Sequence, residues 1–161
     1  MRKRLAVFVI LATFASSPVF AQGARFGIGG SGDISLEDNG GSDFGLGAEM
    51  DYYPGGPVGF RLDGSWIFRT GDDGVLLNTD ATYNFVDHPS IHPFLMGGLS
   101  LGASQSFDET TQLGLNAGAG INFHLRNSPI GLWADGRFHH FFSPDNNGLQ
   151  FMAGVRFGEG E

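Results

Sequence analysis

Apolar and polar residues alternate along most of this chain with a period of two residues. The clearest case is residues 111–125, where every second position from Leu113 to Leu125 is apolar and the intervening positions are Gly, Asn or His. A period of two places neighbouring side chains on opposite faces of a β-strand, whereas a helix would repeat every 3.6 residues. The pattern therefore predicts a strand with one apolar face and one face of small and polar residues.

Seven further segments alternate in the same way, and clusters of Gly, Asp, Asn, Pro and Ser separate them. The eight predicted strands cover residues 25–34, 43–53, 58–70, 74–86, 92–104, 111–125, 129–142 and 148–157. The fifth is rich in glycine, and its pattern does not decide which face is apolar. Because every connection is short, neighbouring strands are expected to pair antiparallel as a meander. The predicted fold class is all-β, an eight-stranded antiparallel up-and-down transmembrane β-barrel.

The first 21 residues have the pattern of a cleaved export signal. A basic segment at residues 2–4 precedes an apolar run from Leu5 to Phe14, and Val19-Phe20-Ala21 provides a signal-peptidase site. An uncleaved membrane anchor is the alternative, but it would need about 20 apolar residues. We therefore predict a signal peptide at residues 1–21 and a single barrel domain at residues 22–161.

Charge and cysteine content narrow the possible functions. The chain has 9 basic and 17 acidic residues, so loss of the three basic residues of the signal leaves 6 against 17, a net charge of −11. The only lysine, Lys3, is lost with the signal. Binding to nucleic acid is disfavoured, because phosphates require a basic surface. No disulfide can form, because the chain has no cysteine.

The identity of the polar face indicates which face points inward. A soluble lipocalin-like barrel would hide its apolar face, whereas a membrane barrel exposes that face to lipid and keeps polar groups in its lumen. The polar face here is rich in Gly, Asn, Asp and Arg, which suits a crowded interior. We expect ion pairs in the lumen among Arg25, Glu49, Asp51, Arg61, Asp63, Arg69, Asp80, Asp135, Arg137 and Arg156. The ten charges balance, and the excess acid is expected on short loops.

The strand pattern, the acid-and-arginine segment Leu132–His139 and the closing segment Leu149–Phe157 resemble the small eight-stranded outer-membrane β-barrels, such as the OmpA transmembrane domain, OmpX and the opacity-type proteins. The resemblance implies location in the bacterial outer membrane, with outer-membrane lipids and lipopolysaccharide as surroundings. It also implies that periplasmic chaperones and the barrel-assembly machinery act on the chain. The assembly signal would be formed by Phe151, Ala153, Val155 and Phe157 in the last strand. The four loops near residues 35–43, 70–74, 104–111 and 143–147 would face outward.

Three functions are compatible with such a barrel. A structural or interaction barrel, filled by its own side chains, agrees with a charge-paired lumen. A narrow channel for small solutes or hydrophobic molecules is the alternative. A lipid A-modifying enzyme is the third, since lipid A deacylase barrels place a His-x-Ser pair on one strand face. Here the residues two positions after His139 and His140 are both Phe, and Ser143 lies out of register. We therefore expect no catalytic residues.

No cofactor or metal site is expected either. His88 and His92 flank a predicted turn without an obvious third ligand. The acidic Asp/Asn/Gly loops at residues 37–43 and 144–148 could offer oxygen ligands to calcium. They match no EF-hand spacing, and tight hairpins favour the same residues.

Overall fold

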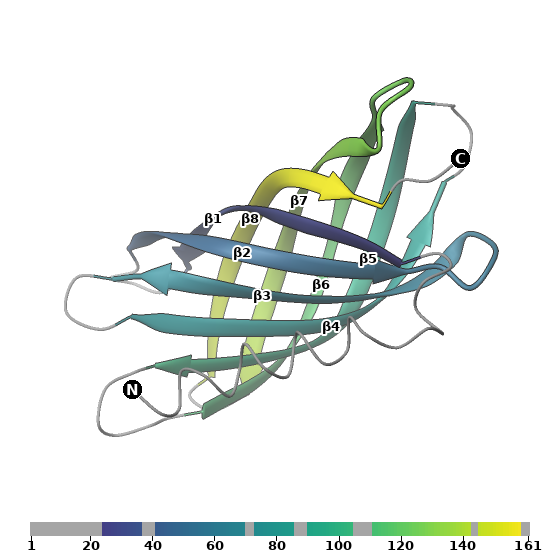
Figure 1. Ribbon diagram of the computed structural model, residues 1–161. Coiled ribbons are helices and arrows are strands. Elements are labelled where there is room, and N and C mark those ends of the chain that lie inside the picture. Colours follow the sequence, from purple (N-terminus) through teal and green to yellow (C-terminus); the bar gives the residue numbers. More distant parts are fainter. Residues whose placement is uncertain are drawn as a thin grey trace, which may run out of the picture.

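The computed structural model describes residues 24–36, 41–69, 73–85, 90–104, 111–142 and 145–158. Its eight strands are β1 (Ala24–Ser35), β2 (Ser42–Tyr52), β3 (Val58–Phe68), β4 (Gly74–Asn84), β5 (Ile91–Ser104), β6 (Thr111–His124), β7 (Ile130–Phe142) and β8 (Asp145–Phe157). Each pairs antiparallel with its neighbour, and β1 pairs with β8 to close the barrel (Figure 1). The predicted fold class is confirmed. The predicted signal peptide, Ser143 and His88 lie outside the described residues.

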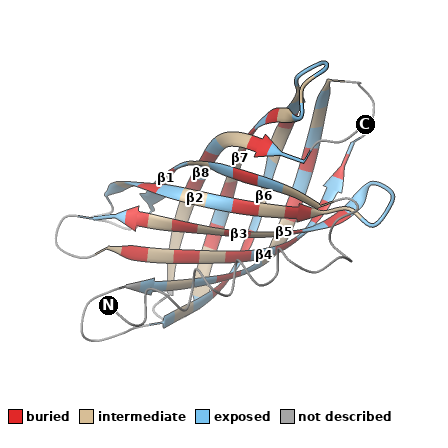
Figure 2. Ribbon diagram, viewed as in Figure 1, coloured by how far each residue is buried: buried red, intermediate tan, exposed pale blue. Residues whose placement is uncertain are grey.

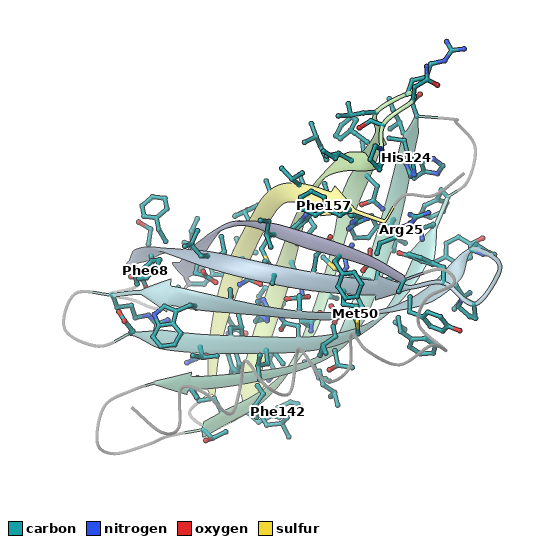
Figure 3. The ribbon with its side chains drawn as sticks, in the orientation of Figure 1. Arg25, Met50, Phe68, His124, Phe142 and Phe157 are labelled. Atoms are coloured by element: carbon teal, nitrogen blue, oxygen red, sulfur yellow. The ribbon has the colours of Figure 1, made fainter. Side chains whose placement is uncertain are left out.

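The predicted strand boundaries agree with the observed ones within three residues, and the largest difference is at β8. This strand begins at Asp145, because Asp145 to Asn147 continue the ladder with β7. The barrel has two ends, which we name by their connections. The loop end joins β1 to β2, β3 to β4, β5 to β6 and β7 to β8, and the turn end joins the other neighbours. Figure 3 shows Phe68 toward the loop end and Arg25 and His124 at the turn end.

Buried and exposed residues alternate along the strands (Figure 2), and most of the large apolar residues are among the exposed ones. Large apolar residues such as Phe44, Leu46 and Leu99 are more than half exposed. Aromatic side chains lie on this outer surface near both ends; they include Phe60, Tyr83, Phe123 and Phe157 at the turn end and Phe44, Phe68 and Phe142 at the loop end. The inward face carries most of the buried polar and charged side chains. The molecule is therefore polar inside and apolar outside, the reverse of a soluble barrel.

The fifth strand, whose pattern did not decide its apolar face, is apolar on both. Leu95 and Leu99 are exposed on the outer surface, whereas Phe94 and Met96 are buried inside, 1 % and 5 % exposed. Glycines make room for such large inward side chains. A Cβ at Gly120 would overlap the ring of Phe94, and one at Gly27 would lie 2.7 Å from Nε1 of Trp133. Glycine at these positions allows a narrow barrel to hold aromatic rings.

Among the described residues, no helix is long and apolar enough to cross a membrane.

Candidate functional site in the barrel lumen

A layer of ion pairs crosses the middle of the lumen. We call it the central ion-pair layer, and its members are Glu49, Asp51, Arg61, Asp63, Asp80, Asp135, Arg137 and Arg156. None of these residues is more than 6 % exposed. They lie at inward positions of five strands, β2, β3, β4, β7 and β8. Their charges are removed from water, so each depends on its partners in the layer.

Arg61 connects opposite walls of this layer. Its Nε and Nη2 donate to the two carboxylate oxygens of Asp51 at 2.7 and 3.1 Å, and its Nη1 donates to Oδ2 of Asp135 at 2.9 Å. Asp51 is on the neighbouring strand, whereas Asp135 is 74 residues away on β7. Arg156 makes a second such centre: it donates to Glu49 and, at 2.6 Å, to Oδ1 of Asn122. Planar guanidinium groups suit these multiple, directed contacts.

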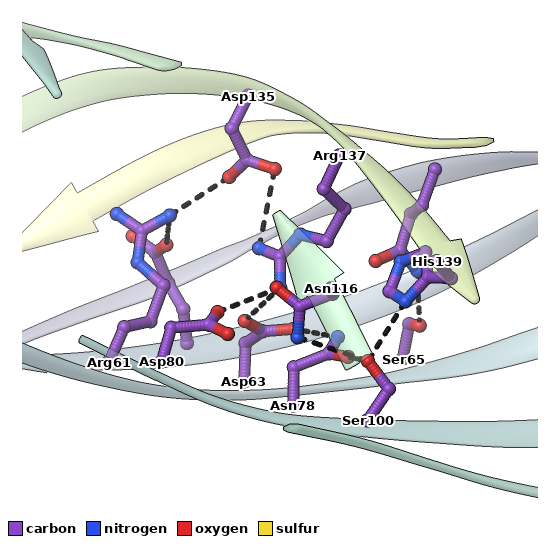
Figure 4. A network of polar contacts seen from close by, with 12 residues as sticks. Arg61, Asp63, Ser65, Asn78, Asp80, Ser100, Asn116, Asp135, Arg137 and His139 are labelled. Atoms are coloured by element: carbon purple, nitrogen blue, oxygen red, sulfur yellow. Dashed lines mark hydrogen bonds and ion pairs between the residues drawn. The ribbon is translucent and has the colours of Figure 1, made fainter. Parts of the chain in front are cut away.

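Arg137 holds the part of the layer nearer the loop end. Its Nη1 donates to Oδ2 of Asp63 at 2.8 Å and to Oδ2 of Asp80 at 3.1 Å, and its Nη2 donates to Oδ1 of Asp135 at 3.3 Å (Figure 4). Asp135 is therefore shared between Arg61 and Arg137. The layer is a single connected network rather than a set of separate pairs.

Two buried aromatic rings fill the space beside the arginines. The guanidinium carbon of Arg61 lies 4.4 Å from the ring centroid of Phe94 and 5.8 Å from that of Trp133. Arg156 lies 6.0 Å from Trp133 on the same layer. These are cation–π distances, and both rings are at most 2 % exposed. Ion pairs and buried rings therefore lie side by side at this level of the lumen.

The structure places Arg25 and Arg69 toward the two ends of the barrel. Arg69 pairs with Asp43 at 2.7 Å near the loop end, where their side chains are 46 % and 30 % exposed. Arg25 lies at the turn end with its guanidinium carbon 5.4 Å from the ring of Tyr53. The buried members of the expected set are five carboxylates and three arginines.

Tyr53 lies just beyond β2 at the turn end. Its hydroxyl accepts a 3.3 Å hydrogen bond from Oγ1 of Thr82, and burial raises the pKa of the Tyr53 phenol. Nearby, the rings of His92 and His124 meet edge to face with centroids 4.9 Å apart. The described residues contain no cluster of three or more His, Cys, Asp or Glu that could hold a metal ion.

A chain of hydrogen bonds runs from the central layer toward the loop end (Figure 4). Nδ2 of Asn78 donates to Oδ1 of Asp63 at 2.8 Å, so Oδ1 of Asn78 is an acceptor and receives the hydroxyl of Ser100 at 2.7 Å. Oγ of Ser100 also lies 2.9 Å from Nδ1 of His139. Which of the two side chains donates in this contact depends on which ring nitrogen of His139 carries the proton.

The same bonds bear on catalysis. Ser100 contacts Asn78, His139 and, at 3.0 Å, Nδ2 of Asn116. Ser100 is only 1 % exposed, whereas a nucleophile has to be reached by its substrate. His140 points outward instead, and its Nδ1 lies 3.0 Å from Oδ1 of Asn147. No positive sign of catalysis is found among the described residues.

A cavity of about 250 Å³ lies at the loop end, and we call it the loop-end cavity. Polar side chains lining it include Asp33, Asp43, Arg69, Gln112 and His139. Ile67, Leu76 and Phe141 contribute apolar wall, and the ring of Phe141 stacks on that of His139 at 5.9 Å. Asp33 and Asp43 were expected among the excess acid of the loops. The structure places both on inward positions of β1 and β2.

The four residues expected to form the assembly signal share the outer face of β8. Phe151, Ala153 and Phe157 are exposed there, and Val155 is half-buried. Several lumen residues had not been singled out from the sequence, namely Ser65, Phe94, Ser100, Asn122 and Gln150. Phe94 and Ser100 belong to the strand of undecided phase. The other three lie on inward faces and would have been found by treating every inward polar residue as a partner for the charges.

No protein-family model matches the chain, and no curated protein matches it in sequence. Solved structures do match. Neisserial surface protein A (NspA) superposes with a TM-score of 0.70 at 16 % identity over 85 % of this chain and 97 % of its own. Ail, the attachment invasion locus protein of Yersinia pestis, superposes with a TM-score of 0.64 at 17 % identity, covering 83 % of this chain and 97 % of Ail.

The N-terminal β-barrel domain of Pseudomonas aeruginosa OprF gives a TM-score of 0.60 at 18 % identity, covering 83 % of this chain and 97 % of that domain. The outer-membrane enzyme PagL has the same fold, with a TM-score of 0.52 at 13 % identity, covering 80 % of this chain and 98 % of PagL. The chain therefore has the fold of the small outer-membrane β-barrels. At these identities the similarity shows the fold and does not distinguish an enzyme from a surface protein.

Proposed function

We propose that this chain is a non-enzymatic structural or interaction barrel of the bacterial outer membrane, closed to solutes by its own side chains. The observation that carries the proposal is the central ion-pair layer with Phe94 and Trp133 beside it. A conducting lumen would need a continuous wet path, whereas Arg61, Arg137 and Arg156 are at most 2 % exposed at this level. The apolar outer surface supports location in lipid.

The first test establishes location and closure of the barrel in one preparation. Cells expressing the full chain are fractionated, and the outer-membrane fraction is run on a gel with and without boiling. A closed, lipid-embedded barrel gives a boiling-dependent band shift in that fraction. A soluble periplasmic protein without a shift would overturn the proposed location.

The second test separates a closed lumen from a narrow channel. Protein reconstituted in planar bilayers is expected to give the conductance of protein-free lipid. The matched variant replaces Phe94 and Trp133 together with Ala, which removes two aromatic rings from the central cross-section. Conductance by this variant alone would support the aromatic part of the plug, whereas steady conductance by the wild-type protein would favour the channel.

We propose further that Phe151, Ala153, Val155 and Phe157 form the surface by which periplasmic chaperones and the barrel-assembly machinery recognise the chain. Support comes from their shared outer face on β8, the strand that closes the barrel with β1. Phe157→Ala is expected to slow appearance of the heat-modifiable band in pulse-chase experiments, with Phe142→Ala as the matched control. Equal rates for the two variants would contradict this role.

A further inference from the structure

We propose that Trp133 and Met152 form a latch across the seam where β8 pairs with β1 and closes the barrel. Each side chain reaches past the neighbouring strand to a glycine on the strand after it. Trp133 extends from β7 to Gly27 on β1, and Met152 extends from β8 to Gly47 on β2. We call these two side chains the seam latch. The inference goes beyond the proposed function, because it concerns how the barrel is kept closed rather than what it does.

The inward face of the seam contains a row of glycines. Gly29 of β1 is the direct partner of Gly154 on β8 and of Gly47 on β2. A Cβ at Gly29 would overlap the backbone oxygen of Ala153, and one at Gly154 would overlap that of Ile28. The two strands therefore need glycine on both sides in order to approach each other. These glycines have no side chains that could pack across the seam, so packing has to come from other residues.

Trp133 reaches this row of glycines from β7. Figure 1 shows β8 between β7 and β1, and the direct partner of Trp133 on β8 is Gly154. A Cβ at Gly27 on β1 would lie 2.7 Å from Nε1 of Trp133. The indole therefore spans β8, where glycine leaves no side chain beside it. Because Trp133 is 2 % exposed, nearly all of its surface is packed against other parts of the lumen.

Met152 makes a second crossing, one residue row nearer the loop end. Its direct partner on β1 is Ser31, yet a Cβ at Gly47 on β2 would lie 2.5 Å from Cε of Met152. The side chain therefore extends past β1 to the next strand, and it is 2 % exposed. Methionine is unbranched and has three rotatable side-chain bonds, so it can make a contact at this reach.

The two contacts of the seam latch depend on closure of the barrel. A contact from β7 to β1 or from β8 to β2 joins strands on opposite sides of the seam, so it forms only when β8 and β1 are paired. Phe94 provides a contrast, because it packs from β5 onto its direct partner Gly120 on the neighbouring strand β6. Loss of either latch residue should therefore loosen the seam most, whereas loss of Phe94 should loosen the β5–β6 ladder most.

Amide hydrogen exchange of the full barrel in lipid nanodiscs measures the opening of each ladder separately. The seam amides are those of residues 26–35 and 148–157, and they are compared with the amides of the β5–β6 ladder. Trp133→Ala and Met152→Ala are expected to speed exchange at the seam about tenfold or more, and in the β5–β6 ladder less than about threefold. Phe94→Ala is the matched control, and the reverse pattern is expected for it.

Milder variants separate the latch from a general loss of packing. Met152→Leu keeps a buried apolar side chain of similar volume but shortens it, so seam exchange is expected to rise about threefold or more. Gly47→Ala places a methyl group at the position that Cε of Met152 contacts, on a strand outside the seam. Gly32→Ala adds the same group on β1, within the seam, where nothing lies within 4 Å of it. Of the two alanine variants, only Gly47→Ala is expected to speed exchange at the seam.

Two results would overturn the proposal. Equal acceleration of exchange in all ladders by Met152→Ala would show that this residue stabilises the barrel generally. Seam exchange changed no more by Gly47→Ala than by Gly32→Ala would show that the contact with β2 does not hold the seam. The boiling-dependent band shift is measured for each variant, and if Trp133→Ala or Met152→Ala does not fold, Met152→Leu and Gly47→Ala decide the outcome.

Discussion

The central ion-pair layer and the loop-end cavity are built from the same strands and the same residue types, yet they differ in burial and filling. In the centre, Arg137 contacts three carboxylates, and all four side chains are at most 1 % exposed. At the loop end, Arg69 pairs with Asp43, and the Arg69 side chain is 46 % exposed. A buried arginine–aspartate pair in the centre is therefore needed for stability, because each charge would otherwise be left without a partner away from water. An arginine–aspartate pair at the loop end is a weak contact, because water screens it.

The comparison predicts the largest effect for loss of a central arginine. Arg137→Leu leaves Asp63, Asp80 and Asp135 short of positive charge in a dry interior, and it is expected to lower the free energy of unfolding by about 3–5 kcal/mol. Unfolding is measured by urea titration in lipid vesicles, with the boiling-dependent band as the readout of folded protein. The matched control is Arg126→Leu in the exposed β6–β7 turn, expected to lie within about 0.5 kcal/mol of wild type. Equal stability of the two variants would show that the layer does not stabilise the barrel.

The central layer has more carboxylates than arginines, so neutralising Asp51 and neutralising Asp80 should change the stability of the barrel by different amounts. Asp51 accepts from Arg61 twice and pairs with Arg156 at 3.0 Å, whereas Asp80 accepts from Arg137 through Oδ2 and its Oδ1 has no partner among the described residues. Asp51→Asn is expected to cost about 1.5–3 kcal/mol, because an amide cannot satisfy those donors.

Asp80→Asn removes one of the surplus charges and puts an amide at the unpartnered position. It is expected to be neutral or stabilising by about 1 kcal/mol or less, since it relieves a buried charge and keeps one acceptor for Arg137. The same urea titration compares the two variants. If Asp80→Asn were as destabilising as Asp51→Asn, the layer would need all five of its negative charges.

Replacing a glycine with alanine should also cost more stability in the centre than at the loop end. A Cβ at Gly98, beside the central layer, would overlap the backbone oxygen of Thr79 and lie 2.6 Å from Oδ1 of Asp80. At Gly102, beside the cavity, the nearest atom would be Cε1 of Phe141 at 3.4 Å. Gly98→Ala is therefore expected to cost about 1–3 kcal/mol, and Gly102→Ala about 0.5 kcal/mol or less. A similar cost for both would mean that the loop end is packed as tightly as the centre.

The alternating pattern predicted the fold well because it depends on one local property. Each strand has to present apolar side chains to one surface, and the period of two records this directly. The exception was β5, where Phe94 and Met96 point into the lumen while Leu95 and Leu99 point outward. The sequence does not distinguish an apolar residue in the lumen from one on the outer surface, so it could not show which face of this strand points outward.

The candidate site was less predictable, because it depends on depth and on contacts across the lumen. Alternation assigned Arg61 and Arg69 to the same inward face, but not their levels along the barrel. Strand register decides this: it places Arg61 opposite Asp51 in the centre, whereas Arg69 reaches Asp43 at the loop end. The contact of Arg61 with Asp135 spans 74 residues and exists only because the barrel is narrow. The cavity likewise forms only when the barrel closes and brings several strands together, so the pattern of one strand cannot predict it.

The smallest expected effect concerns Arg69, and it sharpens the comparison because salt should weaken only a pair that water reaches. Arg69→Gln removes the half-exposed pair with Asp43, so it is expected to cost about 1 kcal/mol or less, with the difference falling as salt is raised. Urea titration at low and high salt measures both the cost of the substitution and its dependence on salt. A loss of stability as large as that of Arg137→Leu would remove the distinction between the two regions.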